Sequence, residues 1–136
     1  MSNSTAQFHH DELASWSRSI KFLSEESDAL IRRIAVVMSK GGSKKQTNQL
    51  NNRINTMLNA ANIFDELRMF IFSQQQRLDR FDTSVAAPDD NFLKQQNRLR
   101  RKVRALEQEF STTKYTGSTF LFDYLRLKTK DIRHKT

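Results

Sequence analysis

The amino-acid sequence predicts an all-α fold, and three observations carry this prediction. Three stretches of the chain carry a ladder of apolar residues; the first and third ladders alternate steps of three and four throughout, and the second breaks this alternation between Phe64 and Ile71. This spacing keeps one stripe of a helix facing a partner helix along its length. Helix-breaking residues are scarce, with three Gly and one Pro in 136 residues. A charged content of 28% beside a hydrophobic content of 37% suits long helices that are wetted on one face.

The first predicted helix spans about residues 6–40. Gly41 and Gly42 follow its last apolar residue, where glycine supplies the left-handed cap that ends a helix. Trp16 lies on the ladder, so we expect it in the core and not in a cofactor site. The ladder consists of Leu13, Trp16, Ile20, Leu23, Ser27, Leu30, Ile34 and Val37.

The second predicted helix spans about residues 44–82. Ser43 and Gln46 have the spacing of a capping box, in which each side chain satisfies the other residue's backbone N–H. A second apolar stripe, Ile63, Leu67 and Phe70, runs beside the ladder, as expected of a helix that touches two neighbours. The ladder consists of Leu50, Ile54, Met57, Ala61, Phe64, Leu67, Ile71, Gln74 or Gln75, Leu78 and Phe81.

The third predicted helix spans about residues 88–130. Pro88 is suited to the first turn of a helix, and the charges of Asp89 and Asp90 suit its N-terminus. Poor helix formers make a kink possible at 111–119, but the heptad phase continues across them, so we expect a continuous helix. Gly117 would then admit a bulky neighbour. The ladder consists of Phe92, Gln96, Leu99, Val103, Leu106, Phe110, Thr113, Gly117, Phe120, Tyr124 and Leu127.

Short connections between long helices make consecutive helices antiparallel. The predicted fold is therefore a single domain over residues 1–136, an up-down-up three-helix bundle with left-handed coiled-coil packing and a spectrin-repeat-like architecture. A hairpin of the first two helices, with the third exchanged into another chain, fits the same pattern.

Composition excludes several classes of function. Without cysteine the chain has no disulfides, thiolate zinc sites or cysteine nucleophiles. The N-terminal sequence does not resemble a signal peptide, and no apolar run approaches the roughly 18 residues of a membrane span, so we expect a soluble, cytoplasmic protein.

Metal and catalytic chemistry have little support in the sequence. His9 and His10 are adjacent and would point about 100° apart on a helix, and His134 is far away in the chain. We interpret the run from His9 to Glu12 as a polar cap on the first helix. No histidine is placed to act as a base for a nucleophile, so we expect neither an enzyme nor a bound cofactor or metal.

The net charge of +8 and a pI of about 10.1 favour anionic partners. Placing the charges by level along the rod predicts a basic band near the second turn, an acidic band in the middle and a basic band at the other end. In the third helix, like charges four residues apart require nearby acids, counterions or an anionic partner, although a solvated surface is the simpler account. The candidate anion-binding residues are Lys94, Arg98, Arg100, Arg101, Lys102 and Arg104.

Apolar residues outside the ladders suggest an interface with another protein. Our leading hypothesis is a non-catalytic helical interaction or scaffolding module that binds itself or another helical protein. The alternative is an anion-binding protein that uses the third helix, with nucleic acid ahead of a membrane surface as its partner, and no small-molecule substrate is evident. The candidate interface residues are Phe22, Ile31, Phe72, Leu121 and Leu125.

The segment FHHDELASWSRSIKFL resembles the start of a group of small uncharacterised bacterial three-helix proteins. Their pattern has His and Trp early in the first helix, followed by Phe and a Glu-rich turn. The matching residues are Phe8, His9, Trp16, Phe22 and Glu26. The resemblance implies a non-enzymatic helical protein and brings no known activity.

Overall fold

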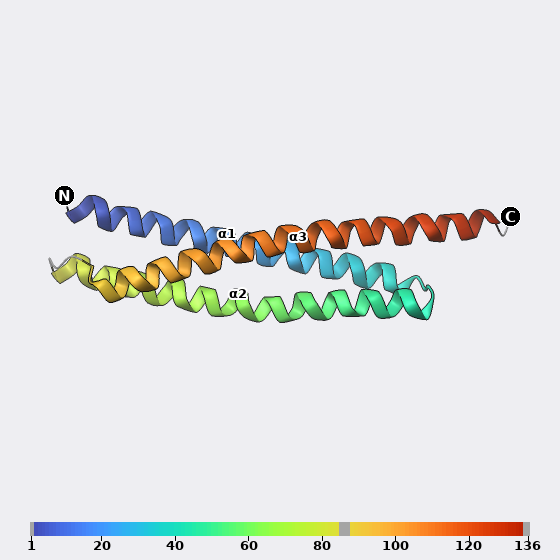
Figure 1. Cartoon of the computed structure of the whole chain (residues 1–136), viewed down its shortest axis with the longest axis horizontal. Coiled ribbons are helices and arrows are strands. Elements are labelled where there is room, and N and C mark those ends of the chain that lie inside the picture. Colours follow the sequence, from blue (N-terminus) through green and yellow to red (C-terminus); the bar gives the residue numbers. More distant parts are fainter. Residues whose placement is uncertain (1, 85–87, 135–136) are drawn as a thin grey trace.

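The computed structural model describes residues 2–84 and 88–134, with the side chains of 5–81, 88–119, 121, 122 and 126. This part of the chain forms three α-helices: α1 (Ser2–Ser39), α2 (Lys44–Ser84) and α3 (Asp90–His134). The helices lie side by side as a rod, with the chain ends at opposite ends of it (Figure 1). The predicted up-down-up three-helix bundle is confirmed. No helix in the described ranges is long and apolar enough to cross a membrane.

The turn between α1 and α2 follows the sequence signals closely. Gly41 has a φ of 84°, the left-handed conformation that favours glycine, and its N–H donates to the Met38 carbonyl at 3.2 Å. The N–H of Gln46 donates to Ser43 Oγ, and the N–H of Ser43 donates to Gln46 Oε1, both at 3.1 Å. The predicted capping box is therefore present and marks the start of α2.

The start of α3 differs from the prediction. The helix begins at Asp90, and the N–H of Phe92 donates to Asp89 Oδ1 at 2.8 Å. Asp89 is therefore the N-cap, because its side chain satisfies a free N–H of the first turn. Pro88 precedes the cap, so its predicted place within the first turn is wrong. Residues 85–87 of the predicted connection lie outside the described residues.

Helix α3 continues without a break through residues 111–119. The hydroxyl of Thr112 donates to the Gln108 carbonyl at 3.2 Å, and that of Thr116 donates to the Thr112 carbonyl at 2.9 Å, so these polar groups are satisfied within the helix. A Cβ on Gly117 would lie 3.2 Å from Leu30 Cδ2. The expectation that Gly117 admits a bulky neighbour is confirmed.

The core divides into two clusters along the rod. The large core cluster contains Trp16, as predicted, and the small core cluster lies towards the α1–α2 turn. We also predicted core positions for Phe120, Tyr124 and Leu127, and their side chains are not among those that the structure describes. The buried residues of the large cluster are Ala6, Leu13, Trp16, Ile20, Leu23, Phe64, Leu67, Ile71, Leu78, Phe92, Leu99, Val103, Leu106 and Phe110. Those of the small cluster are Leu30, Ile34, Val37, Leu50, Met57 and Leu121.

The three helices do not pack equally closely. Helices α1 and α2 form a tightly packed hairpin, whereas α3 approaches each of them less closely. In Figure 1, α3 runs obliquely across the hairpin, and its C-terminal end projects beyond the α1–α2 turn. This arrangement leaves part of the surface between α2 and α3 open.

Candidate functional site: the groove between α2 and α3

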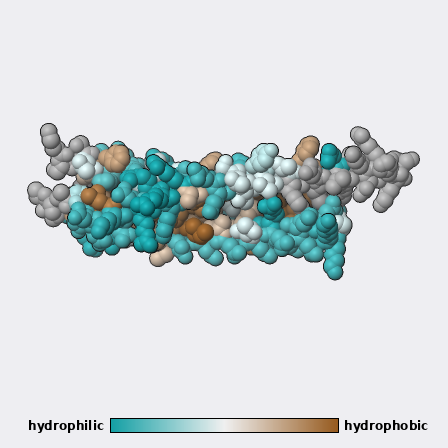
Figure 2. Space-filling view, in the orientation of Figure 1, coloured by the Kyte–Doolittle hydropathy of each residue, from teal (hydrophilic) through white to brown (hydrophobic). Residues whose placement is uncertain are grey.

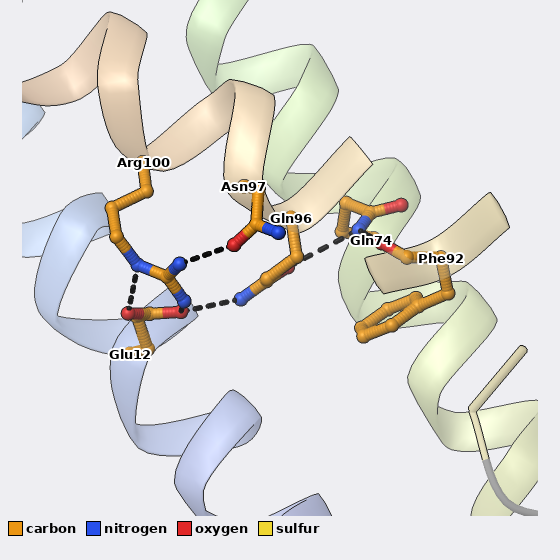
Figure 3. Close-up of polar contacts among 6 residues, drawn as sticks. All are labelled: Glu12, Gln74, Phe92, Gln96, Asn97 and Arg100. Atoms are coloured by element: carbon orange, nitrogen blue, oxygen red, sulfur yellow. Dashed lines mark hydrogen bonds and ion pairs between the residues drawn. The ribbon is translucent and has the colours of Figure 1, made fainter. Parts of the chain in front are cut away.

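A polar network joins all three helices near the α2–α3 end of the rod (Figure 3). Arg100 donates two hydrogen bonds to the Glu12 carboxylate, from Nε at 2.8 Å and from Nη2 at 2.7 Å. Gln96 donates to Glu12 at 3.0 Å and accepts from Gln74 at 3.1 Å. Gln74 also donates to the Phe92 carbonyl at 3.2 Å. Polar residues at ladder positions thus set the relative register of α1, α2 and α3.

The hydrogen bonds to Glu12 hold the Arg100 guanidinium within the helix bundle. Burial alone would raise the pKa of Glu12, but the hydrogen bonds from Arg100 and Gln96 outweigh it and lower the pKa. The hydrogen bonds to Glu12 in turn raise the pKa of Arg100, whose guanidinium lies 5.8 Å from the centre of the Trp16 ring. Arg100 was predicted to bind an external anion, and this is corrected, because an internal carboxylate occupies its guanidinium.

His9 lies beside this network in an apolar environment. Its ring contacts Phe92 and Phe8 edge to face, with centroids 5.4 and 5.6 Å apart, and its buried Nδ1 has no hydrogen-bond partner. Burial lowers the pKa of His9, and the nearby Arg100 charge adds to that effect, while Glu12 opposes it. His9 is therefore a neutral core residue. No three His, Asp or Glu side chains within the described ranges gather closely enough to hold a metal ion.

The polar cap predicted for residues 9–12 is also corrected. Helix α1 begins at Ser2, so these residues lie in its second and third turns, away from its free N–H groups. Glu12 instead bonds to α3, and His10 Nε2 lies 4.0 Å from Asp79 on α2. Residues 9–12 therefore contact both α2 and α3. The sequence pattern of α1 alone does not predict these contacts.

Four of the other candidate cations point outward from α3. Lys94, Arg98, Arg101 and Arg104 are exposed, and none of them forms an ion pair or hydrogen bond with another described side chain. Lys102 is also exposed, but its Nζ lies 5.0 Å from the centre of the Phe70 ring. The structure therefore leaves a basic face on α3 after Arg100 is removed from the predicted set.

The most distinctive surface feature is a groove between α2 and α3. Three adjoining hollows share lining residues and follow the two helices, and the two larger ones have volumes of about 240 and 310 Å³. A hydrophobic patch is visible between α2 and α3 near the middle of the rod (Figure 2). We call this feature the α2–α3 groove. Its walls include Ala60, Ile63 and Phe70 from α2, and Arg98, Lys102, Ala105 and Glu109 from α3.

One of the two larger hollows of the groove lies where the two core clusters meet. Met57 of the small cluster and Phe64 and Phe110 of the large cluster line it, together with Ser27 of α1. Ser27 occupies a ladder position that elsewhere in α1 carries a large apolar side chain. Its small side chain leaves space, and the open packing of α2 and α3 exposes that space to the surface.

The upper walls of the groove expose apolar side chains between charges of both signs. Ile63 is 43% exposed and Phe70 is 46% exposed, although they were expected to touch a neighbouring helix of the bundle. Their stripe partner Leu67 is buried. Glu66 and Glu109 lie along one part of the groove, and Arg98 and Lys102 lie nearer the α2–α3 connection. The groove was not predicted as a site. The second apolar stripe of α2, Ile63, Leu67 and Phe70, was the sequence feature that could have indicated it.

The predicted interface residues are scattered and do not line the groove. Phe22 and Phe72 are exposed, and Ile31 is partly buried against the small core cluster. Leu121 is corrected: it is buried within that cluster, because α3 turns it towards α1 and α2. The side chain of Leu125 lies outside those that the structure describes.

Comparison with known proteins gives no match. No protein-family model, no curated protein and no solved structure matches the chain. The resemblance of the N-terminal segment to small bacterial three-helix proteins therefore stays a prediction.

Proposed function

We propose that this protein is a non-catalytic helical interaction module that docks a helical segment in the α2–α3 groove. The observation that carries this proposal is the groove itself, in which Ile63 and Phe70 are exposed together above an apolar floor. Apolar residues concentrated in an elongated groove between two helices suit the apolar face of a third helix. Single exposed apolar residues elsewhere on a surface need no such explanation.

The titratable groups of the polar network, which lies next to the Arg98 end of the groove, support an interaction role over catalysis. The shifted pKa values of His9, Glu12 and Arg100 arise from burial and from their contacts with one another. These contacts join helices and do not direct a reactive atom into the α2–α3 groove. Burial and the contacts between helices therefore explain these pKa shifts, and no catalytic role is needed to explain them.

A photo-crosslinking experiment tests the proposal. Because the chain has no cysteine, an Ala105→Cys variant can be labelled selectively with a benzophenone in the groove. A Phe72→Cys variant, at an exposed position of α2 outside the groove, is the matched control. We expect adducts with a second polypeptide, either another copy or a different helical protein, to form several-fold more from position 105. Equal yields from both positions, at high protein concentration and in extracts of producing cells, would contradict the proposal.

The basic face of α3 favours a second candidate function, the binding of a nucleic acid. Lys94, Arg98, Arg101 and Arg104 lack intramolecular counterions among the described residues, so a phosphate backbone could neutralise them. Binding to duplex DNA at about 50 mM salt should weaken when salt is raised. A Lys94→Glu/Arg101→Glu variant should lose this binding, whereas reversal of the exposed α1 charges in Arg32→Glu/Arg33→Glu should matter less. Binding to anionic vesicles in place of DNA would instead indicate a membrane surface.

A further inference from the structure

We propose that the basic face of α3 and the Phe70 ring of α2 together bind a single-stranded nucleic acid, with its phosphates on the cations and a base stacked on the ring. This inference rests on the second candidate function, nucleic-acid binding by α3, and specifies the form of the nucleic acid. Two observations carry it. An exposed aromatic ring lies against the basic face, and no acidic residue of α2 or α3 interrupts the cations there.

The aromatic ring comes from a neighbouring helix. Between Phe92 and Phe110, α3 contains no aromatic residue, so its own sequence offers a base nothing to stack on. In the structure, Phe70 of α2 lies against α3 in a hollow that Arg98 and Lys102 also line. The ring is 46% exposed, and Lys102 Nζ lies 5.0 Å from its centre. The fold therefore places beside the cations an aromatic side chain that their own helix lacks.

The cations form a stripe that passes the ring. Lys94, Arg98 and Arg101 are spaced by four and three residues, so they share one face of α3 and cover about 10 Å along its axis. Arg98 and Lys102 line the hollow at Phe70, and they also line an open surface hollow together with Lys94 and Arg101. The ring and the cations are therefore parts of one continuous surface.

This stretch of α2 and α3 carries no negative charge. The two helices are antiparallel, and Gln74 is hydrogen-bonded to Gln96, so these two residues mark one level of the rod. Both helices rise equally per residue, so residues 67–78 of α2 lie within the levels that residues 91–106 of α3 span. Neither range contains Asp or Glu. Glu66 comes directly before the first range, so we expect a bound strand to extend from the ring towards the α2–α3 connection.

The chemistry of this surface suits an unpaired strand. Proteins that bind single strands combine a basic track for the phosphates with aromatic side chains on which the bases stack. In a duplex the bases are already stacked on one another, so Phe70 would add little to its binding. The Lys102 ammonium contacts the ring and forms no ion pair or hydrogen bond with another described side chain, so it can move to a phosphate when a base covers the ring. The exposed ring therefore favours a single strand over a duplex.

Binding to oligonucleotides tests the form of the nucleic acid. Fluorescence anisotropy at about 50 mM salt compares labelled oligothymidylate, oligouridylate and a duplex of the same length as ligands of the full-length chain. We expect single strands to bind several-fold more tightly than the duplex, and the two single strands show whether DNA or RNA is preferred. With four cations as phosphate contacts, log Kd should rise with log salt with a slope of about 3. Arg98→Gln should weaken single-strand binding several-fold more than Arg104→Gln, because Arg104 lies on a different side of α3.

Substitution of the ring tests the stacking. Phe70→Ala should raise the Kd for oligothymidylate by about fivefold or more and leave duplex binding unchanged. Phe72→Ala is the matched control, because Phe72 is also exposed but points to another side of α2. A base stacked at position 70 should quench the indole fluorescence of Phe70→Trp but not that of Phe72→Trp. The native Trp16 is buried and gives the same background in both variants.

The outcomes separate this inference from the functions proposed above. Duplex binding as tight as single-strand binding, or a Phe70→Ala variant that binds oligothymidylate like the wild-type chain, would overturn the inference and leave nucleic-acid binding by α3 standing. No binding to any of the three oligonucleotides, or binding to anionic vesicles alone, would overturn both. A helix docked in the groove would compete with the strand for Phe70, and crosslinking from position 105 without nucleic acid tests that docking separately.

Discussion

Among single residues, Glu12 of α1 accepts hydrogen bonds from two residues of α3. Its carboxylate accepts two hydrogen bonds from Arg100 and one from Gln96, and the Glu12 side chain is 14% exposed. Glu12→Ala should lower the free energy of unfolding by about 2–3 kcal/mol, because it leaves partly buried donors without an acceptor. Urea denaturation measures this loss. Glu25→Ala, at an exposed position of the same helix, should change stability much less, and an equal loss in both variants would contradict the assigned role.

The pKa of His9 makes stability depend on pH. The folded pKa is lowered from 6.5, so as the pH falls through 6.5 the unfolded chain binds a proton that the folded chain excludes. Stability should therefore fall as the pH drops below 6.5. Denaturant unfolding at several pH values measures this loss, which His9→Leu should remove. A His9→Leu variant with the full wild-type slope between pH 6.5 and the titration of the carboxylates would show that another group is responsible.

The pKa of Glu12 also makes the stability of the fold decrease as the pH falls, but in a more acidic range than that of His9. Its folded pKa is lowered from 4.5, so the unfolded chain binds a proton first as the pH falls through 4.5. The stability that the charged carboxylate contributes is present above that pH and is lost as the pH falls through the folded pKa. Acid unfolding should therefore begin at the end of the rod that carries the polar network.

At the scale of elements, the contact between α1 and α3 at Gly117 limits how the third helix can lie. Gly117→Val should destabilise the protein by about 1–3 kcal/mol, because the added atoms meet the side chain of Leu30. In a double-mutant cycle with Leu30→Ala, the combined loss should be smaller than the sum of the two single losses. Thermal or urea unfolding of the four proteins provides the measurement. Strict additivity would show that the two side chains do not meet.

Across the whole molecule, the hollow above Ser27 separates the two core clusters. Ser27→Leu should fill part of the 240 Å³ hollow and raise the free energy of unfolding by about 0.5–2 kcal/mol. Calorimetry should then show a higher melting temperature, whereas Ser15→Leu, at an exposed position of α1, should not. A destabilised Ser27→Leu variant would show that the space is too narrow for the added side chain. The filled hollow should also reduce crosslinking from position 105 if the docked helix reaches the floor of the groove.

Much of the fold was predictable because its signals are local. The apolar ladders, Gly41 and the Ser43–Gln46 capping box depend on spacings of a few residues, and the structure has each of them. The start of α3 was misplaced because both Pro88 and Asp89 are suited to a helix N-terminus. The choice between them depended on a side-chain hydrogen bond that the sequence pattern does not reveal.

The site was less predictable because it depends on contacts between distant parts of the chain. Arg100 looks like its neighbours in the sequence, and only Glu12, 88 residues earlier, distinguishes it from them. Leu121 lies off the ladder but is buried by the direction in which α3 crosses the hairpin. By itself, the sequence determined the three helices, their antiparallel order and most of the core, since periodicity and caps act within each helix. The tertiary structure decided which cations stay free and which apolar stripe stays open, because both depend on how closely α3 packs against α1 and α2.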